Sequence, residues 1–124
     1  MDIFRATNDT CADAAGLVVV IDVLRAFTTA AYLFDAGVEE IFLVSGVDEA
    51  FALRDQFPGS LLLGEVNGIQ VPGFDMGNSP SAVLARMDLG KRVIQRTSAG
   101  TQGVVRTDKA DTILTASLVN AAAT

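Results

Sequence analysis

Apolar and polar positions along this 124-residue chain follow two patterns, one typical of buried strands and one typical of helices. Short segments centred on β-branched, aliphatic or aromatic residues predict strands at residues 17–21, 40–44, 60–63, 92–96 and 112–116. Apolar residues at helical spacing predict helices at residues 26–36, 48–56 and 80–87, and a short one from residue 101. Strands alternating with helices in this way indicate an α/β domain with a mainly parallel or mixed sheet.

The first strand, Leu17 to Ile21, is continuously apolar, which predicts burial on both faces of the sheet. Polar residues follow the strands where each one ends. They are Asp22, Glu65, Thr97, Ser98 and Ser117. Ligands of open parallel sheets bind outside the carboxyl ends of the strands. We therefore expect a site at this edge.

A long stretch from Gly64 to Pro80 has neither a helical nor an alternating period. Loops of this length in compact domains are usually functional or disordered. Its apolar residues, among them Val71, Phe74 and Met76, argue against disorder because solvated linkers lack such anchors. The stretch is expected to form a lid or wall over the carboxyl edge of the sheet.

Half of the residues are apolar and 19% are charged, which fits a single domain over residues 1–124. The formal charge of −6 argues against binding to nucleic acid or to an anionic membrane. The apolar run from Leu17 to Phe34 contains Asp22 and Arg25, so we do not expect it to span a membrane. One cysteine, Cys11, allows no internal disulfide and fits a reducing cytoplasm.

The chain has no histidine, which excludes a Ser-His-Asp triad and the HExxH zinc site. The glycine-rich GxxxxGK[ST] phosphate loop is also absent. A metal would have to be bound mostly by oxygen, from Asp22, Glu65 or Asp75. Oxygen ligands favour magnesium or manganese.

The segment DVLRAFTT, residues 22–29, offers one interpretation as a site and one as a structural cap. Asp22 could hold a divalent cation while Arg25 pairs with an anionic oxygen and Thr28 donates a hydroxyl. Equally, Asp22 could cap the following helix and form an ion pair with Arg25.

The segment TSAGT, residues 97–101, places hydroxyls and a glycine before a helix. Free amides and hydroxyls of Ser98, Gly100 and Thr101 could bind a phosphate or sulfonate there, and Arg96 would help, because an arginine at the end of an apolar strand is useful beside an anion. The alternative is an ordinary strand-to-helix turn with a hydroxyl cap.

Four polar residues between Gly64 and Pro80 can also be interpreted either as structural residues or as site residues. Asn78 and Ser79, before Pro80, have the form of a helix N-cap followed by proline at the first helical position. Glu65 and Asp75 flank a glycine-rich turn, which invites a metal or general-acid role, although loop acids are ordinarily solvated.

Five motifs together resemble the amino-terminal half of the 2-phosphosulfolactate phosphatases. In chain order they are IDVLRAFTT, LLLGEVNG, VPGFDMGNSP, TSAGT and SLVNAAA. The resemblance implies a three-layer α/β/α fold and a magnesium-dependent hydrolase that converts 2-phosphosulfolactate to sulfolactate and phosphate, a step of coenzyme M biosynthesis. Carried over by position, the family pattern points to Asp22, Arg25, Thr28, Glu65, Asp75, Asn78, Ser79, Gly100 and Thr101.

Three differences from the family pattern keep alternatives open. Val66 stands where the family usually has arginine. TSAGT stands where members more often have Thr-Asn-Gly-Thr, so Ser98 and Ala99 change the polar lining. Family chains are also about twice as long. The alternatives are a non-catalytic anion-binding or interaction module of the same fold, and a phosphohydrolase for another small phosphate ester. The expected partners are a small anionic phosphate ester and a second copy of the chain, because a missing half would leave an apolar surface uncovered.

Overall fold

The computed structural model describes residues 1–124, and its strands and helices follow one another in the predicted order, with one additional short strand at residues 69–70. In chain order the elements are η1 (Cys11–Asp13), β1 (Gly16–Ile21), α1 (Ala26–Asp35), β2 (Glu40–Leu43), α2 (Val47–Gln56), β3 (Leu61–Val66), β4 (Ile69–Gln70), α3 (Pro80–Ala85), β5 (Arg92–Arg96), α4 (Gly100–Arg106) and β6 (Ala110–Ala116). The predicted α/β fold class is confirmed.

The strands form two sheets. The larger sheet has the order β2-β5-β3-β4, in which β2, β5 and β3 run parallel and β4 runs antiparallel to β3. Its register places Phe42 and Leu62 on either side of Ile94. The smaller sheet consists of β1 and β6, which are parallel.

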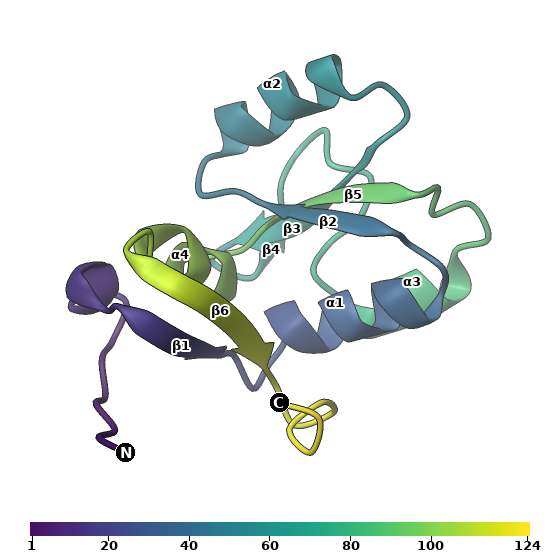
Figure 1. Cartoon of the computed structure of the whole chain (residues 1–124). Helices are drawn as coiled ribbons and strands as arrows, with labels where there is room; N and C mark the ends of the chain where they lie inside the picture. The colour runs from purple at the N-terminus through teal and green to yellow at the C-terminus, as the bar shows by residue number, and fades with distance from the viewer.

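Helices cover both faces of the larger sheet and give the fold three layers (Figure 1). One core cluster lies between this sheet and the helices α1 and α3, and its members are Leu33, Val38, Leu63, Met76, Val83, Leu89 and Val93. A second cluster lies on the α2 side and comprises Val44, Ala50, Leu62, Val71, Phe74 and Ile94. Neighbouring strand residues point to opposite faces, so Leu62 and Leu63 pack in different clusters.

Helix α4 contacts elements of both sheets, through β1 and β2. It lies very close to β1, since a Cβ atom on Gly103 would stand 2.8 Å from Cγ1 of Val20. The absence of a side chain at Gly103 therefore allows the helix and the strand to pack at this distance. None of the helices has the length and the apolar character needed to cross a membrane.

The expectation that the first strand is buried on both faces is wrong. Leu17, Val19 and Ile21 are 65%, 43% and 69% exposed. They alternate along β1 and so share one face, opposite to the face of Val20 that meets α4. Helix α4 packs against β1 on the face of Val20, and the opposite face of the strand stays exposed.

The long stretch after residue 63 is more regular than its sequence indicates. Strand β3 continues to Val66 and turns back into β4 through Asn67 and Gly68, which have φ angles of 52° and 82°. Two consecutive positive φ angles are typical of a type I′ hairpin turn, for which Asn-Gly is the preferred pair. This dipeptide was the signal in the sequence that the period-based prediction missed.

The remainder of the stretch lies beside β3. Met76 pairs with Leu63 in a parallel bridge, and the Gly64 amide donates to the Met76 carbonyl oxygen at 3.0 Å. Val71, Phe74 and Met76 are buried, as expected of anchors. The stretch is therefore fixed by the core, and its last residues lead into α3.

Candidate active site

A pocket of about 230 Å³ opens at the carboxyl ends of β1, β3 and β5. Its lining residues are Asp22, Leu24, Arg25, Glu65, Gly68, Asn78, Thr97, Ser98 and Ala99. Six of the residues that the sequence indicated meet in this lining, namely Asp22, Arg25, Glu65, Asn78, Thr97 and Ser98. The edge at which the site was expected is therefore where the structure has a pocket, although β1 belongs to a different sheet from β3 and β5.

Asp22 follows β1 directly, and only one of its two carboxylate oxygens accepts a hydrogen bond. Its Oδ1 accepts a hydrogen bond from the Ala26 amide at 3.2 Å, which caps the start of α1, while Oδ2 accepts none from the chain. A Cβ atom on Gly100 would lie 2.8 Å from this Oδ2 and 2.6 Å from the Ala26 Cβ. Gly100 thus lets α4 begin against the carboxylate, and one carboxylate oxygen stays free to bind.

Arg25 lines the pocket with its guanidinium unpaired. Its side chain is exposed and takes part in no hydrogen bond or ion pair within the chain. The alternative in which Asp22 forms an ion pair with Arg25 is therefore not realised, whereas the capping by Asp22 is. The Thr28 hydroxyl donates to the Val23 carbonyl oxygen at 3.5 Å and does not reach the pocket lining.

Glu65 is buried and accepts hydrogen bonds on both carboxylate oxygens. Oε1 accepts from the Ser98 amide at 2.6 Å, and Oε2 accepts from the Gly68 amide at 2.6 Å and from the Ser98 hydroxyl at 3.0 Å. Burial alone raises the pKa of Glu65, but these hydrogen bonds and the nearby charge of Arg96 outweigh it, so the pKa is lowered from its ordinary value. Glu65 is therefore an anion at neutral pH, and it joins the β3–β4 turn to the segment after β5.

Arg96 is used to join backbone segments and is not part of the pocket lining. Its Nε donates to the Ser45 carbonyl oxygen at 3.0 Å, and Nη1 donates to the Glu65 carbonyl oxygen at 2.8 Å. Close packing in the same region requires Gly64, because a Cβ atom there would lie 1.8 Å from the Arg96 carbonyl oxygen. The guanidinium of Arg96 holds the ends of β2 and β3 beside β5.

The turn between β5 and α4 uses most of its polar groups internally. The Thr101 hydroxyl accepts from the Thr97 amide at 2.8 Å and donates to the Thr97 carbonyl oxygen at 2.9 Å. The Thr101 amide donates to the Thr97 hydroxyl at 3.1 Å, and the Ser98 amide is bonded to Glu65. The expected set of free amides and hydroxyls is thus largely absent, which fits the alternative of a capped turn.

Asn78 lines the pocket, whereas its neighbour Ser79 does not. Asn78 is buried and lines the pocket, and its Oδ1 accepts a hydrogen bond from Nε2 of Gln95 at 3.4 Å. Ser79 is the N-cap residue of α3, followed by Pro80, and its hydroxyl pairs with that of Ser81 at 2.8 Å. Gln95 was not predicted from the sequence, in which its only signal is a polar residue directly after the apolar pair Val93 and Ile94 of β5.

Asp75 does not join Asp22 and Glu65 at the pocket. Its Oδ2 accepts a hydrogen bond from the Leu62 amide at 2.8 Å and lies 3.9 Å from the guanidinium of Arg54. The pairing of Met76 with Leu63 places Asp75 beside an early residue of β3, away from the end of the strand where Glu65 lies. No three histidine, cysteine, aspartate or glutamate residues cluster to form a metal site. Of the two carboxylates expected to accompany Asp22, Glu65 lies with it in the pocket lining and Asp75 does not.

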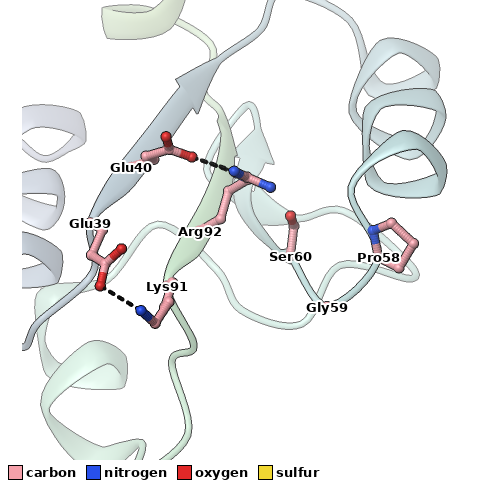
Figure 2. Close-up of a pocket in the computed structure, with 7 residues that line it drawn as sticks. All are labelled: Glu39, Glu40, Pro58, Gly59, Ser60, Lys91 and Arg92. Atoms are coloured by element: carbon pink, nitrogen blue, oxygen red, sulfur yellow. Dashed lines mark hydrogen bonds and ion pairs between the residues drawn. The ribbon is translucent and has the colours of Figure 1, made fainter.

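A second hollow of about 230 Å³ lies at the opposite edge of the larger sheet, where β2 and β5 begin. Its charged side chains pair with one another, as Figure 2 shows for Glu40 with Arg92 and for Glu39 with Lys91. The N–O distances in these pairs are 2.6 Å and 2.9 Å. Since each charge has its partner, this hollow has no unpaired charge comparable to Arg25.

Comparisons with known proteins agree with the motifs of the pocket. The model of the family described as 2-phosphosulpholactate phosphatase matches residues 2–124. The chain is 46% identical over 106 residues to a probable 2-phosphosulfolactate phosphatase of Carboxydothermus hydrogenoformans, a match that covers 86% of this chain and 44% of that protein. It is 46% identical over 86 residues to the Bacillus subtilis protein of the same name, covering 69% of this chain and 38% of that one.

A third relative, the probable 2-phosphosulfolactate phosphatase of Deinococcus radiodurans, is 43% identical over 104 residues. That match covers 83% of this chain and 43% of the relative. The chain therefore spans less than half the length of the curated relatives that it matches.

Proposed function

We propose that this chain, which belongs to the 2-phosphosulpholactate phosphatase family, binds the phosphoryl group of 2-phosphosulfolactate in the pocket beside Asp22 and Glu65 and acts in its hydrolysis to sulfolactate and phosphate. The observation that carries the proposal is the unpaired guanidinium of Arg25 in the pocket lining. A free arginine fork matches the oxygens of a phosphoryl group in two parallel hydrogen bonds.

Charge stabilisation is the main contribution that the pocket can make. Negative charge on the phosphoryl oxygens would be balanced by Arg25, and preorganised donors of this kind stabilise charge as it develops. Glu65 is not suited to donate a proton, because its lowered pKa keeps it ionised at neutral pH. Its proposed role is that of a charged anchor and metal ligand.

A magnesium ion is the cofactor that we propose, and the carboxylates of the pocket fit it. Magnesium commonly takes one or two protein carboxylates together with water and phosphate oxygens. Asp22 has an oxygen without a hydrogen bond, and Glu65 is a carboxylate in the same lining. When bound, magnesium would supply positive charge to the phosphoryl oxygens and make a water molecule more acidic.

The substitution Asp22→Asn tests the assignment. It keeps the size of the side chain and an oxygen that can cap α1, but it removes the charge. We expect a fall in kcat of at least about a hundredfold, as for the loss of a group that stabilises transition-state charge. Asp35→Asn, at the exposed end of α1, is the matched control. Undiminished phosphate release by a folded Asp22→Asn variant would refute the assignment.

A non-catalytic anion-binding module is the second candidate function. It is favoured by the position of Asp75 outside the pocket, which leaves Asp22 and Glu65 as the carboxylates of the lining. A binder would be stabilised by inorganic phosphate and would release none from any ester. A phosphohydrolase for another small ester would instead release phosphate from that ester in preference to 2-phosphosulfolactate.

We also propose that the chain associates with a second copy through the outer face of β1 and β6. Leu17, Val19 and Ile21 are exposed on this face, and Leu118 and Val119, just after β6, are 73% and 56% exposed. Contiguous apolar patches of this kind usually mark interaction sites. A net charge of −6 makes nucleic acid and anionic membranes unsuitable partners.

The proposed cellular setting is the cytoplasm, which rests on Cys11. This residue is a free, buried thiol, and such a thiol is kept reduced in the cytosol. Formation of sulfolactate would place the reaction in coenzyme M biosynthesis. This assignment to a pathway follows from the proposed activity and stands or falls with it, whereas the cellular setting does not depend on it.

A further inference from the structure

Gln95 is a polar side chain inside an apolar layer. It follows Val93 and Ile94 in β5, and all three residues are fully buried. Its Oε1 has no hydrogen-bond partner. A buried oxygen without a partner destabilises a fold, and a leucine of similar volume would avoid the loss. Gln95 therefore needs an explanation other than packing.

The contacts of Gln95 fix the orientation of two neighbouring groups. Its Nε2 donates to the Ala26 carbonyl oxygen at 3.0 Å, and since a carbonyl only accepts, the amide nitrogen must face it. The same nitrogen donates to Oδ1 of Asn78 at 3.4 Å. Asn78 must therefore turn its oxygen toward Gln95, which leaves Nδ2 as its free donor.

The free donor belongs to the pocket. Asn78 lines the pocket, and its Nδ2 makes no hydrogen bond within the chain. The other contact of Gln95, Ala26, begins α1, and its amide donates to Oδ1 of Asp22. Gln95 is not among the residues that line the pocket, but it donates hydrogen bonds to Ala26, which follows the Asp22 to Arg25 segment, and to Asn78, which lines the pocket.

We propose that Gln95 is a positioning residue of the pocket: it holds the Asn78 carboxamide so that Nδ2 donates to an oxygen of a bound phosphoryl group. The proposal rests on the proposed function, because it requires a phosphoryl group in this pocket. The proposal goes beyond the proposed function by assigning a role to Gln95, a residue that would not contact the ligand. A glutamine is suited to this role because its amide can donate to two acceptors at once.

The test is a titration of the ¹⁵N-labelled chain with inorganic phosphate, followed through the side-chain signals of Asn78 and Arg25. In the unsubstituted chain, we expect the Asn78 Nδ2 pair to shift as phosphate binds. In Gln95→Leu, the Asn78 shift should be lost and the dissociation constant for phosphate should rise about tenfold. Gln70→Leu is the matched control, because Gln70 also donates to a backbone oxygen, that of Phe74, outside the pocket lining. It should retain the affinity.

A double-mutant cycle separates positioning from a general structural role. If Gln95 acts through Asn78, Gln95→Leu should weaken phosphate binding no further once Asn78→Ala is present. Additive losses would overturn the proposal. The titration of the unsubstituted chain tests the proposal even if Gln95→Leu does not fold. A shift at Arg25 with none at Asn78 would refute the role of Gln95 and leave the proposed function intact, whereas no shift at either would refute both.

Discussion

The ionised side chain of Glu65 joins two walls of the pocket by accepting hydrogen bonds from both. Its carboxylate accepts three hydrogen bonds, from Gly68 and Ser98, and the isosteric substitution Glu65→Gln would turn an amide group toward at least one of these donors. We expect the variant to lose about 1–3 kcal/mol of unfolding free energy at pH 7, measured by urea denaturation. Glu39→Gln, which removes one partner of an exposed ion pair with Lys91, should change stability by less than about 1 kcal/mol.

The same residue gives a pH dependence with a definite sign. Because the pKa of Glu65 is lowered in the folded chain, its ionised form stabilises the fold above the ordinary pKa of glutamate. That contribution is lost as the pH falls through the lowered pKa. The difference in stability between the unsubstituted chain and Glu65→Gln should therefore shrink on acidification below about pH 4. A difference that stays constant from pH 7 to pH 3 would contradict this account.

Individual site residues were predictable where the end of a strand determined their position. Asp22, Glu65 and Ser98 lie at or just after strand ends and were found by that rule. Asp75 and Arg96 were not, because their surroundings depend on long-range contacts with Leu62 and Ser45. Gln95 was missed because its role depends on Ala26 and Asn78, which are distant in sequence.

At the scale of elements, α1 and α4 meet beside the pocket through a glycine. Gly100→Ala would place a Cβ atom 2.6 Å from that of Ala26 and 2.8 Å from Oδ2 of Asp22. We expect this substitution to push the helices apart, to lower the unfolding free energy by about 1–3 kcal/mol, and to weaken phosphate binding. Thermal unfolding and a phosphate titration would measure the two effects.

Gly77→Ala is the control for that substitution. A Cβ atom at Gly77 would meet its nearest neighbours at 3.5 Å and 3.6 Å, which is ordinary contact. Its effect on stability should be small, and phosphate binding should be unchanged. If the two alanine variants had the same unfolding free energy and the same affinity for phosphate, the close approach of α4 to Asp22 would not be required for stability or for phosphate binding.

The order and type of the elements were largely predictable, because apolar runs and helical spacing are local signals. The β3–β4 hairpin was missed, since two short strands joined by Asn67 and Gly68 have too few residues to produce a visible period. The extension of β3 to Val66 also brought Glu65 into a strand. The turn residues themselves were the better signal at this point.

At the scale of the whole molecule, the outer face of β1 and β6 determines the association that we expect. Ile21→Lys would place a charge in the centre of the proposed contact between copies, and we expect it to weaken self-association at least tenfold, measured by sedimentation velocity over a range of concentrations. Met87→Lys is the control, because Met87 is 98% exposed and lies beyond α3. A monomer at all concentrations in the unsubstituted chain would contradict the proposed self-association.

The arrangement of the sheets could not be predicted from the sequence. An apolar strand such as residues 17–21 has the same composition whether both faces are covered or only one. The structure separates β1 and β6 from the larger sheet and leaves one face of β1 open. Fold class is encoded in local alternation, whereas the position of each strand depends on contacts between distant segments.

The central claim is that this pocket binds and hydrolyses a phosphate ester, and its most direct test is the release of inorganic phosphate by the purified chain from 2-phosphosulfolactate. The assay is run with magnesium and then with excess chelator. We predict release that requires magnesium and stops when the metal is removed. No release by a folded chain in the presence of magnesium would contradict the claim that the pocket is catalytic.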